Sequence, residues 1–133
     1  MAHVINGTNN GETINGTDAN DTIYAKGGDD TVIDDKGNDW IYGGDGNDVL
    51  TGGRGTNDYW GDAGNDVVKV VARGAFSDDL VHGFTQGQDK IDVSAWGITD
   101  FTQVQDLLYT DNHGDATFNA YYNGFDHVMR IAD

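Results

Sequence analysis

The sequence predicts an all-β fold whose first half winds into a right-handed parallel β-roll, a solenoid built from nonapeptides. Two observations predict this fold. An oxygen-bearing side chain recurs every nine residues, and an apolar or aromatic side chain recurs with the same period two positions later. The first series is Glu12, Asp21, Asp30, Asp39, Asp48, Asn57 and Asp66, and the second is Ile14, Ile23, Val32, Ile41, Leu50, Tyr59 and Val68. Two registers that share one period across this length are typical of a solenoid.

The charge of the chain points to a cation as its partner. The 133 residues include 23 Asp and Glu against 7 Lys and Arg, which gives a formal net charge of -16. The acidic residues are spaced regularly, whereas a disordered acidic tail has them in runs. No basic cluster is present to bind nucleic acid. The absence of Cys excludes disulfides and thiolate metal sites.

No segment has the length and apolar character of a membrane span or of a cleaved N-terminal signal. A cytosolic protein and a protein exported without such a signal both remain compatible with this observation.

The best copies of the repeat show why glycine, aspartate and an apolar residue recur together. They run from Gly43 to Thr51 and from Gly61 to Lys69 and match Gly-Gly-x-Gly-x-Asp-x-U-x, where U is a large apolar residue. Each copy predicts a six-residue turn followed by a three-residue strand, in which Leu50 faces inward and its two neighbours face outward. Glycine permits the left-handed backbone of such a turn. Calcium requires about 6–8 oxygen ligands, which two stacked turns can supply together.

Each nonamer reverses the chain once, so stacked turns are expected to lie eighteen residues apart. One side of the roll, here the Asp48 edge, then has the turns that end at Glu12, Asp30, Asp48 and Asp66. The opposite side, here the Asp39 edge, has the turns that end at Asp21, Asp39 and Asn57. The best sites are predicted between Asp30 and Asp48, between Asp48 and Asp66, and between Asp21 and Asp39. Asn57 brings no charge, and the turn before Glu12 lacks most of its glycines, so their sites are poorer candidates.

This pairing predicts about 3–5 calcium ions, given the oxygen demand of each ion. The candidate ligands are side-chain oxygens of the periodic residues and backbone carbonyls of the turns. They are Asp21, Asp30, Asp39, Asp48, Asn57 and Asp66, with Gly28, Gly37, Gly43, Gly44, Asp45, Gly46, Gly52, Gly53, Gly55, Gly61, Ala63 and Gly64. Without calcium the thin core and the repelling carboxylates favour an unfolded chain, so calcium binding is expected to drive folding.

Residues 6–69 resemble the RTX repeat region of proteins secreted by bacterial type I systems, such as serralysin proteases, lipases, repeat toxins and the R-modules of alginate epimerases. The segments 76–84 and 87–95 resemble the stretch that comes after the repeats in those families. The resemblance implies export by the type I machinery with an uncleaved C-terminal signal, and folding outside the cell. The sequence departs from the pattern at Asn57, which replaces Asp, and at Ala25-Lys26 and Asp34-Asp35, which replace the glycine pair. These turns are expected to bind less well.

The chain is expected to divide into a roll over residues 1–72 and a C-terminal cap and secretion-signal region over residues 73–133 that packs on it. Within the cap, residues 80–84 and 90–93 read as short strands around a turn. A short helix is predicted over roughly residues 100–108. Asn123-Gly124 predicts a hairpin between residues 116–122 and 125–131.

Asp89 and Asp92 have two interpretations that the sequence leaves open. Their carboxylates could complete a last calcium site, or they could cap turns.

No catalytic site is predicted. The His-Glu-x-x-His and Gly-x-Ser-x-Gly motifs are absent, and the four His are scattered. The chain is therefore expected to be a non-catalytic, extracellular calcium-binding module that folds on calcium after secretion.

The alternative is a calcium-dependent module that binds an alginate-like polysaccharide. It rests on Tyr24, Tyr42 and Trp60, which share one outward strand position, with Trp40 beside them. The favoured expectation is that the C-terminal half covers this aromatic face.

Overall fold

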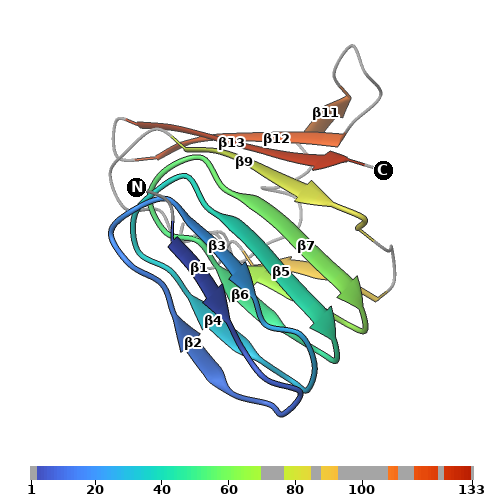
Figure 1. Cartoon of the computed structure of the whole chain (residues 1–133). Helices are drawn as coiled ribbons and strands as arrows, with labels where there is room; N and C mark the ends of the chain where they lie inside the picture. Colours follow the sequence, from blue (N-terminus) through green and yellow to red (C-terminus); the bar gives the residue numbers. More distant parts are fainter. Residues whose placement is uncertain are drawn as a thin grey trace.

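The computed structural model describes residues 3–69, 77–84, 88–92, 108–110, 116–122 and 125–132, and it confirms an all-β parallel roll. Two sheets face each other (Figure 1). The eight-stranded sheet has the order β1 (His3–Asn6), β3 (Asp21–Tyr24), β5 (Trp40–Asp45), β7 (Asp58–Ala63), β9 (Ser77–His82), β13 (Phe125–Ala132), β12 (Ala116–Tyr122) and β11 (Leu108–Thr110). The five-stranded sheet has the order β10 (Lys90–Asp92), β8 (Val67–Lys69), β6 (Val49–Thr51), β4 (Thr31–Ile33) and β2 (Thr13–Asn15).

The repeat sets the register between coils. Up to β8, successive strands alternate between the two sheets, so each coil adds one strand to each sheet. Val49 pairs with Thr31 on one side and with Val67 on the other, all in parallel and eighteen residues apart. This is the predicted period of two nonamers per coil.

One apolar side chain per strand forms the core, as predicted. Leu50 is fully buried while its neighbours Val49 and Thr51 are only partly buried. The buried apolar residues are Ile14, Ile23, Ala25, Val32, Ile41, Leu50, Tyr59, Val68 and Val81. A core one residue wide in each strand buries little apolar surface, so stacking must supply much of the stability.

The roll continues beyond the last regular nonamer. Strand β9 pairs in parallel with β7, and β10 pairs in parallel with β8. The two strands expected after residue 79 are therefore present, but they lie in opposite sheets and form a further coil. Val81 from this coil is buried in the core, and Phe84 and Ile91 pack against it.

The predicted C-terminal hairpin is confirmed. Strands β12 and β13 pair antiparallel, from Ala116 opposite Ile131 to Tyr122 opposite Phe125. Strand β13 also pairs in parallel with β9, so the hairpin extends the eight-stranded sheet at its edge (Figure 1). The helix predicted over residues 100–108 lies outside the described residues except for Leu108, which begins β11.

Candidate functional site

Two columns of carboxylates run along the edges of the roll. On the Asp48 edge, Oδ1 of Asp48 accepts a hydrogen bond from the backbone N–H of Asp30 at 2.9 Å. Oδ1 of Asp66 does the same for Asp48, also at 2.9 Å. On the Asp39 edge, Oδ1 of Asp39 accepts from the N–H of Asp21 at 2.8 Å. Each side chain therefore fastens its turn to the turn one coil earlier in the sequence, which confirms the predicted stacking.

The second oxygen of these carboxylates has no such partner. The Oδ2 atoms of Asp30, Asp39, Asp48 and Asp66 are buried and receive no hydrogen bond. A buried ionised oxygen without a partner is costly, because it has lost water and gained nothing in return. Calcium is a hard cation that takes carboxylate and carbonyl oxygens. The donor set and its unpartnered oxygens therefore fit calcium.

In the copies that stack on an earlier coil, the fourth residue of the nonamer is glycine for a steric reason. Gly46 has a φ of 124°, and a Cβ added there would lie 2.0 Å from the carbonyl oxygen of Gly28, one coil earlier. No other residue adopts this φ readily. The equivalent glycines with positive φ are Gly28, Gly37, Gly55 and Gly64.

The second residue of the nonamer is less restricted. Gly44 and Gly53 have positive φ, and Lys26 and Asp62 adopt it at the equivalent positions. The loss of glycine at Lys26 therefore leaves the turn conformation intact.

The first glycine of the nonamer leaves room beside the carboxylate. A Cβ on Gly43 would lie 2.5 Å from Oδ2 of Asp48, and one on Gly61 would lie 2.3 Å from Oδ2 of Asp66. Gly52 has the same place beside Asn57. These glycines therefore keep open the space into which the unpartnered oxygens point. Asp45 and Ala63, by contrast, have exposed side chains at the tips of their turns.

Asn57 keeps the stacking hydrogen bond but differs in its second atom. Its Oδ1 accepts from the N–H of Asp39 at 3.1 Å, while its Nδ2 donates to the carbonyl of Gly53 at 3.5 Å. The hydroxyl of buried Tyr59 accepts from the N–H of Gly52 at 3.1 Å in the same turn. An amide N–H cannot bind a cation, so this turn offers no second side-chain oxygen from its sixth residue.

Burial changes the protonation of the carboxylates. Loss of water raises the pKa of Asp39, Asp48 and Asp66 to about 6, and it raises the pKa of Asp30 to a smaller extent. For Asp34, burial and then the charge of Asp39 raise the pKa to about 8. These shifts come mainly from burial, which disfavours the charged form of each carboxylate.

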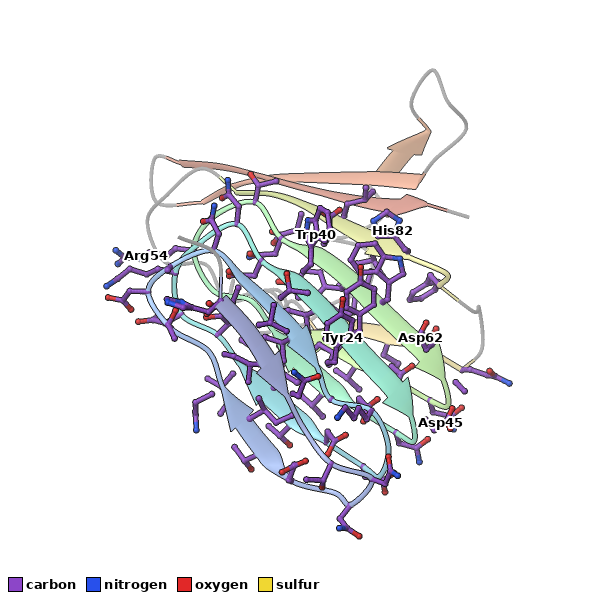
Figure 2. The ribbon with its side chains drawn as sticks, in the orientation of Figure 1. Tyr24, Trp40, Asp45, Arg54, Asp62 and His82 are labelled. Carbon is purple, nitrogen blue, oxygen red and sulfur yellow. The ribbon has the colours of Figure 1, made fainter. Side chains whose placement is uncertain are left out.

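The aromatic side chains on the eight-stranded sheet form a stacked ladder. The ring centroids of Tyr24 and Tyr42 lie 4.9 Å apart, those of Tyr42 and Trp60 lie 4.4 Å apart, and those of Trp60 and His82 lie 4.2 Å apart. The ring planes are nearly parallel in each pair. Trp40 meets Trp60 edge-on at 6.4 Å. Figure 2 shows Tyr24, Trp40 and His82 over the sheet between its two turn edges, with Arg54 on one edge and Asp45 and Asp62 on the other.

Contrary to expectation, the described part of the C-terminal half leaves the Tyr24 and Trp40 end of this aromatic face uncovered. Trp40 is 52% exposed and Tyr24 is 39% exposed. The reason is the register of the hairpin, which adds β13 beside β9 and so continues the sheet sideways. A hollow of about 370 Å³ lies beside Trp40 and is lined also by Asn20, Asp21, Thr22 and Asn38.

Sequence reasoning missed Asp79 at the C-terminal end of its pattern, and it left the role of Asp89 open between a calcium ligand and a turn cap. Asp79 accepts from the N–H of Asn57 at 2.9 Å and is buried, so it continues the Asp39 edge. Asp89 accepts from the N–H of Asp66 at 3.0 Å and continues the Asp48 edge. The signal for both was the Asp-x-apolar triplet at Asp79-Leu80-Val81 and at Asp89-Lys90-Ile91. His82 as the fourth ring of the ladder was missed as well.

Fold and site together define a parallel β-roll with two columns of buried carboxylates along its edges. Residues 6–33 and 33–68 match the family model of the RTX calcium-binding nonapeptide repeat, which spans four copies. This segment therefore belongs to the RTX repeats, and the chain contains an RTX calcium-binding module. No helix among the described residues has the length and apolar character needed to cross a bilayer.

One solved structure that resembles the chain is the solution structure of the AlgE6R3 subunit from the Azotobacter vinelandii mannuronan C5-epimerase. The match has 23% sequence identity and a TM-score of 0.49, and it covers 92% of this chain and 72% of that chain. No curated protein matches the sequence at a significant level.

Proposed function

We propose that this chain is a non-catalytic module of a secreted protein that folds when it binds calcium outside the cell. The observation that carries the proposal is the set of buried Oδ2 atoms without a partner along the two edges. Each belongs to a carboxylate whose other oxygen already fastens two coils together. The same side chain therefore stacks the coils and offers an oxygen to an ion between them.

Electrostatics couples the binding to folding. The described part of the chain has few cations near these columns: Lys36 pairs with the exposed Asp18, and His3 lies 3.2 Å from Asp21. Buried carboxylates at successive coils repel one another strongly when nothing neutralises them. A metal that binds the folded chain alone stabilises it by its binding free energy. Calcium therefore decides whether the roll forms.

The ions are assigned to the spaces between stacked turns. On the Asp48 edge these are the spaces between Asp30 and Asp48 and between Asp48 and Asp66, and on the Asp39 edge the space between Asp21 and Asp39. The expected number remains about 3–5 ions, set by the oxygen demand of calcium. Asp89 is placed to extend the Asp48 edge by one further turn.

Secretion by a type I system explains why folding depends on calcium. RTX repeat proteins are typically secreted, and an acidic chain that stays unfolded at low calcium is suited to threading through a narrow exporter. The proposal places folding outside the cell, where calcium is abundant.

The test is a calcium titration of the chelator-stripped protein, followed by far-UV circular dichroism. The expected result is a cooperative change from coil to β-structure with calcium and none with magnesium at the same concentrations. Magnesium is the matched control because it has the same charge but resists the loss of its water. A spectrum that is rich in β-structure without metal and unchanged by calcium would sink the proposal.

A second candidate function is polysaccharide binding, and the exposed aromatic ladder favours it. An exposed aromatic ring with polar neighbours suits a sugar ring, and Trp40 is exposed beside a hollow that polar side chains line. The protein is acidic, so an anionic, alginate-like glycan would need bridging calcium ions.

The test of this second function compares Trp40→Ala with Ile33→Ala in calcium. Ile33 is also exposed, at 45%, but lies in the opposite sheet. Polysaccharide binding in the wild type that only Trp40→Ala weakens supports this function. Binding that both variants retain, or that the wild type lacks, removes it.

A further inference from the structure

Asp34 is an anomaly in the repeat. It occupies the first position of its nonamer, where Gly16, Gly43, Gly52 and Gly61 stand in other copies. In other copies, glycine at this position leaves space beside the carboxylate of the same turn. A charged side chain in its place would be expected to turn outward, to the surface. Instead the Asp34 side chain is only 2% exposed, and its Oδ2 is buried and receives no hydrogen bond.

The earlier coil makes the room for this side chain. A Cβ on Gly16 would lie 2.3 Å from Cγ of Asp34, so the carboxylate fills the space above that glycine. Its Oδ1 accepts from the N–H of Asp35 at 2.9 Å, which fixes its direction. The side chain therefore points into the interval between two stacked turns of the Asp39 edge.

Three carboxylates meet in that interval. Asp21, Asp34 and Asp39 are all buried, and each offers an oxygen within 4.8 Å of those of the other two. Thr17 holds Asp21 with its backbone N–H at 2.6 Å and with its hydroxyl. Asp39 gives one oxygen to the N–H of Asp21 and keeps its Oδ2 unpartnered. The buried, unpartnered Oδ2 atoms of Asp34 and Asp39 thus lie close to the Asp21 carboxylate, which Thr17 holds in place.

We propose that Asp34 is a metal ligand, and that Asp21, Asp34 and Asp39 hold one calcium ion in a three-carboxylate site unlike the other sites of the roll. The inference rests on the proposed function and adds a ligand that the nonapeptide pattern does not contain. Affinity for calcium rises with the number of charged ligands. This site is therefore the tightest in the protein and fills first, even though its turn lacks the glycine pair of the repeat.

Asp34 also compensates for Asn57. The Asp39 edge loses one carboxylate at Asn57, whose Nδ2 donates a hydrogen bond where an aspartate would offer an oxygen. It gains one at Asp34, one turn earlier on the same edge. The negative charge of the edge is thus moved to a single interval.

Two alternative roles for Asp34 lead to different outcomes. In the first, Asp34 holds a proton and shares it with Asp39, so that no ion is needed. In the second, Asp34 obstructs a site that glycine would leave open. Asp34→Asn imitates the protonated acid, and Asp34→Gly restores the glycine of the other turns. Asp35→Asn removes the same charge from an exposed neighbour and is the matched control.

The experiment is isothermal titration of calcium into the chelator-stripped full chain and the three variants. We expect Asp34→Asn and Asp34→Gly to weaken the tightest class of sites by about tenfold or more, since one charged ligand is lost. Asp35→Asn should bind as the wild type does. If Asp34→Asn does not fold in saturating calcium, Asp34→Gly decides, because it has the regular turn sequence.

Wild-type affinity in Asp34→Asn overturns the inference in favour of a shared proton. Tighter binding in Asp34→Gly overturns it in favour of an obstruction. Both of these results leave calcium-dependent folding of the wild type intact. A wild type that binds no calcium removes the proposed function and this inference together.

Discussion

The backbone N–H of Asp48 donates a 2.9 Å hydrogen bond to Oδ1 of Asp66, while Oδ2 of Asp66 lies buried without a donor. One carboxylate thus performs two tasks with its two oxygens. The first task needs only an acceptor, which Asn can also provide. The second needs a charged oxygen, which Asn lacks. The repeat can therefore lose a calcium ligand at one coil and still keep its stacking.

Asp48→Asn should raise the calcium concentration needed for folding. Asp48 lies between two proposed sites, so the variant loses a charged ligand while its Oδ1 keeps the hydrogen bond from Asp30. We expect the midpoint of the circular dichroism titration to rise roughly tenfold or more. Asp45→Asn is the control, because the Asp45 side chain is exposed at the turn tip. Equal midpoints for the two variants would contradict the assignment of Asp48 as a ligand.

Asn57→Asp should have opposite effects with and without calcium. The new carboxylate keeps the hydrogen bond from Asp39 through Oδ1 and supplies a buried charged oxygen where the amide now donates to Gly53. We expect tighter calcium binding in titration calorimetry and lower stability in chelator. Asn65→Asp adds the same charge on the surface and should change neither. Unchanged calcium binding in Asn57→Asp would show that the Tyr59 hydroxyl closes this turn to the ion.

Gly46→Ala should be among the most damaging substitutions in the roll. The new methyl group would require φ near 124° and would meet the carbonyl oxygen of Gly28 at 2.0 Å. We expect a loss of about 3 kcal/mol or more in the free energy of unfolding, measured with urea in saturating calcium. Gly83→Ala is the control: Gly83 has a φ of 62° but nothing within 4 Å of its Cβ position. That variant should lose only about 1–2 kcal/mol. A similar loss in both variants would mean that the positive φ, and not the contact with the Gly28 carbonyl, is what requires glycine at position 46.

Acid should favour the metal-free fold. Burial raises the pKa of Asp39, Asp48 and Asp66 to about 6 in the folded chain, against an ordinary value of 3.8. Acids whose pKa is raised by folding stabilise the folded state below their ordinary pKa, and the benefit is lost as the pH rises through about 6. Circular dichroism in chelator should therefore show more β-structure near pH 5 than near pH 7.5. The calcium-saturated protein should change little over this range. A gain of β-structure with rising pH would contradict the shifts.

Val81→Ala should destabilise the whole roll, because β9 forms one of its coils. Val81 is buried in the same core as Tyr59 and Val68. We expect a loss of roughly 2 kcal/mol from the cavity, in a single cooperative transition in urea with calcium present. Val4→Ala removes the same groups from a side chain that is 65% exposed and should cost much less. Two separate transitions would show that residues 77–92 fold independently of the repeats.

The period of the sequence was enough to predict the regular part of the roll. It placed Leu50 inside, Val49 outside and Asp48 beside Asp30, because an apolar register and an acidic register constrain each other. It missed Asp79 and left Asp89 between two interpretations, because these residues lie 22 and 23 residues from the residues whose N–H groups donate to them. Longer connections preserve the stacking while they break the spacing, so only the Asp-x-apolar triplet survives as a signal.

Other features depended on contacts that no single repeat contains. Asp34 looked like a lost glycine, and only the space above Gly16 shows that its carboxylate turns inward. The aromatic face was expected to be covered, and its exposure comes from the edge at which β13 pairs. That edge is chosen by strand pairing between segments about fifty residues apart, from Ser77 to His127. Local patterns do not encode such a choice.

The backbone hydrogen bonds to the buried side chains at the sixth repeat position all run the same way along the stack, whereas the exposed N–H of Asn47 donates in the opposite direction, to Asp29 one coil earlier. In each bond at the sixth position, the coil later in the sequence accepts and the earlier coil donates, from Glu12 and Asp30 onward. The roll is therefore a polar assembly, with chemically different leading and trailing faces, as a protein filament has. A chain that orders from its C-terminal coil backwards meets a side-chain acceptor already in place for each new buried N–H group at the sixth repeat position. Growth in the other direction would leave buried N–H groups waiting for a partner, which is the less favourable order.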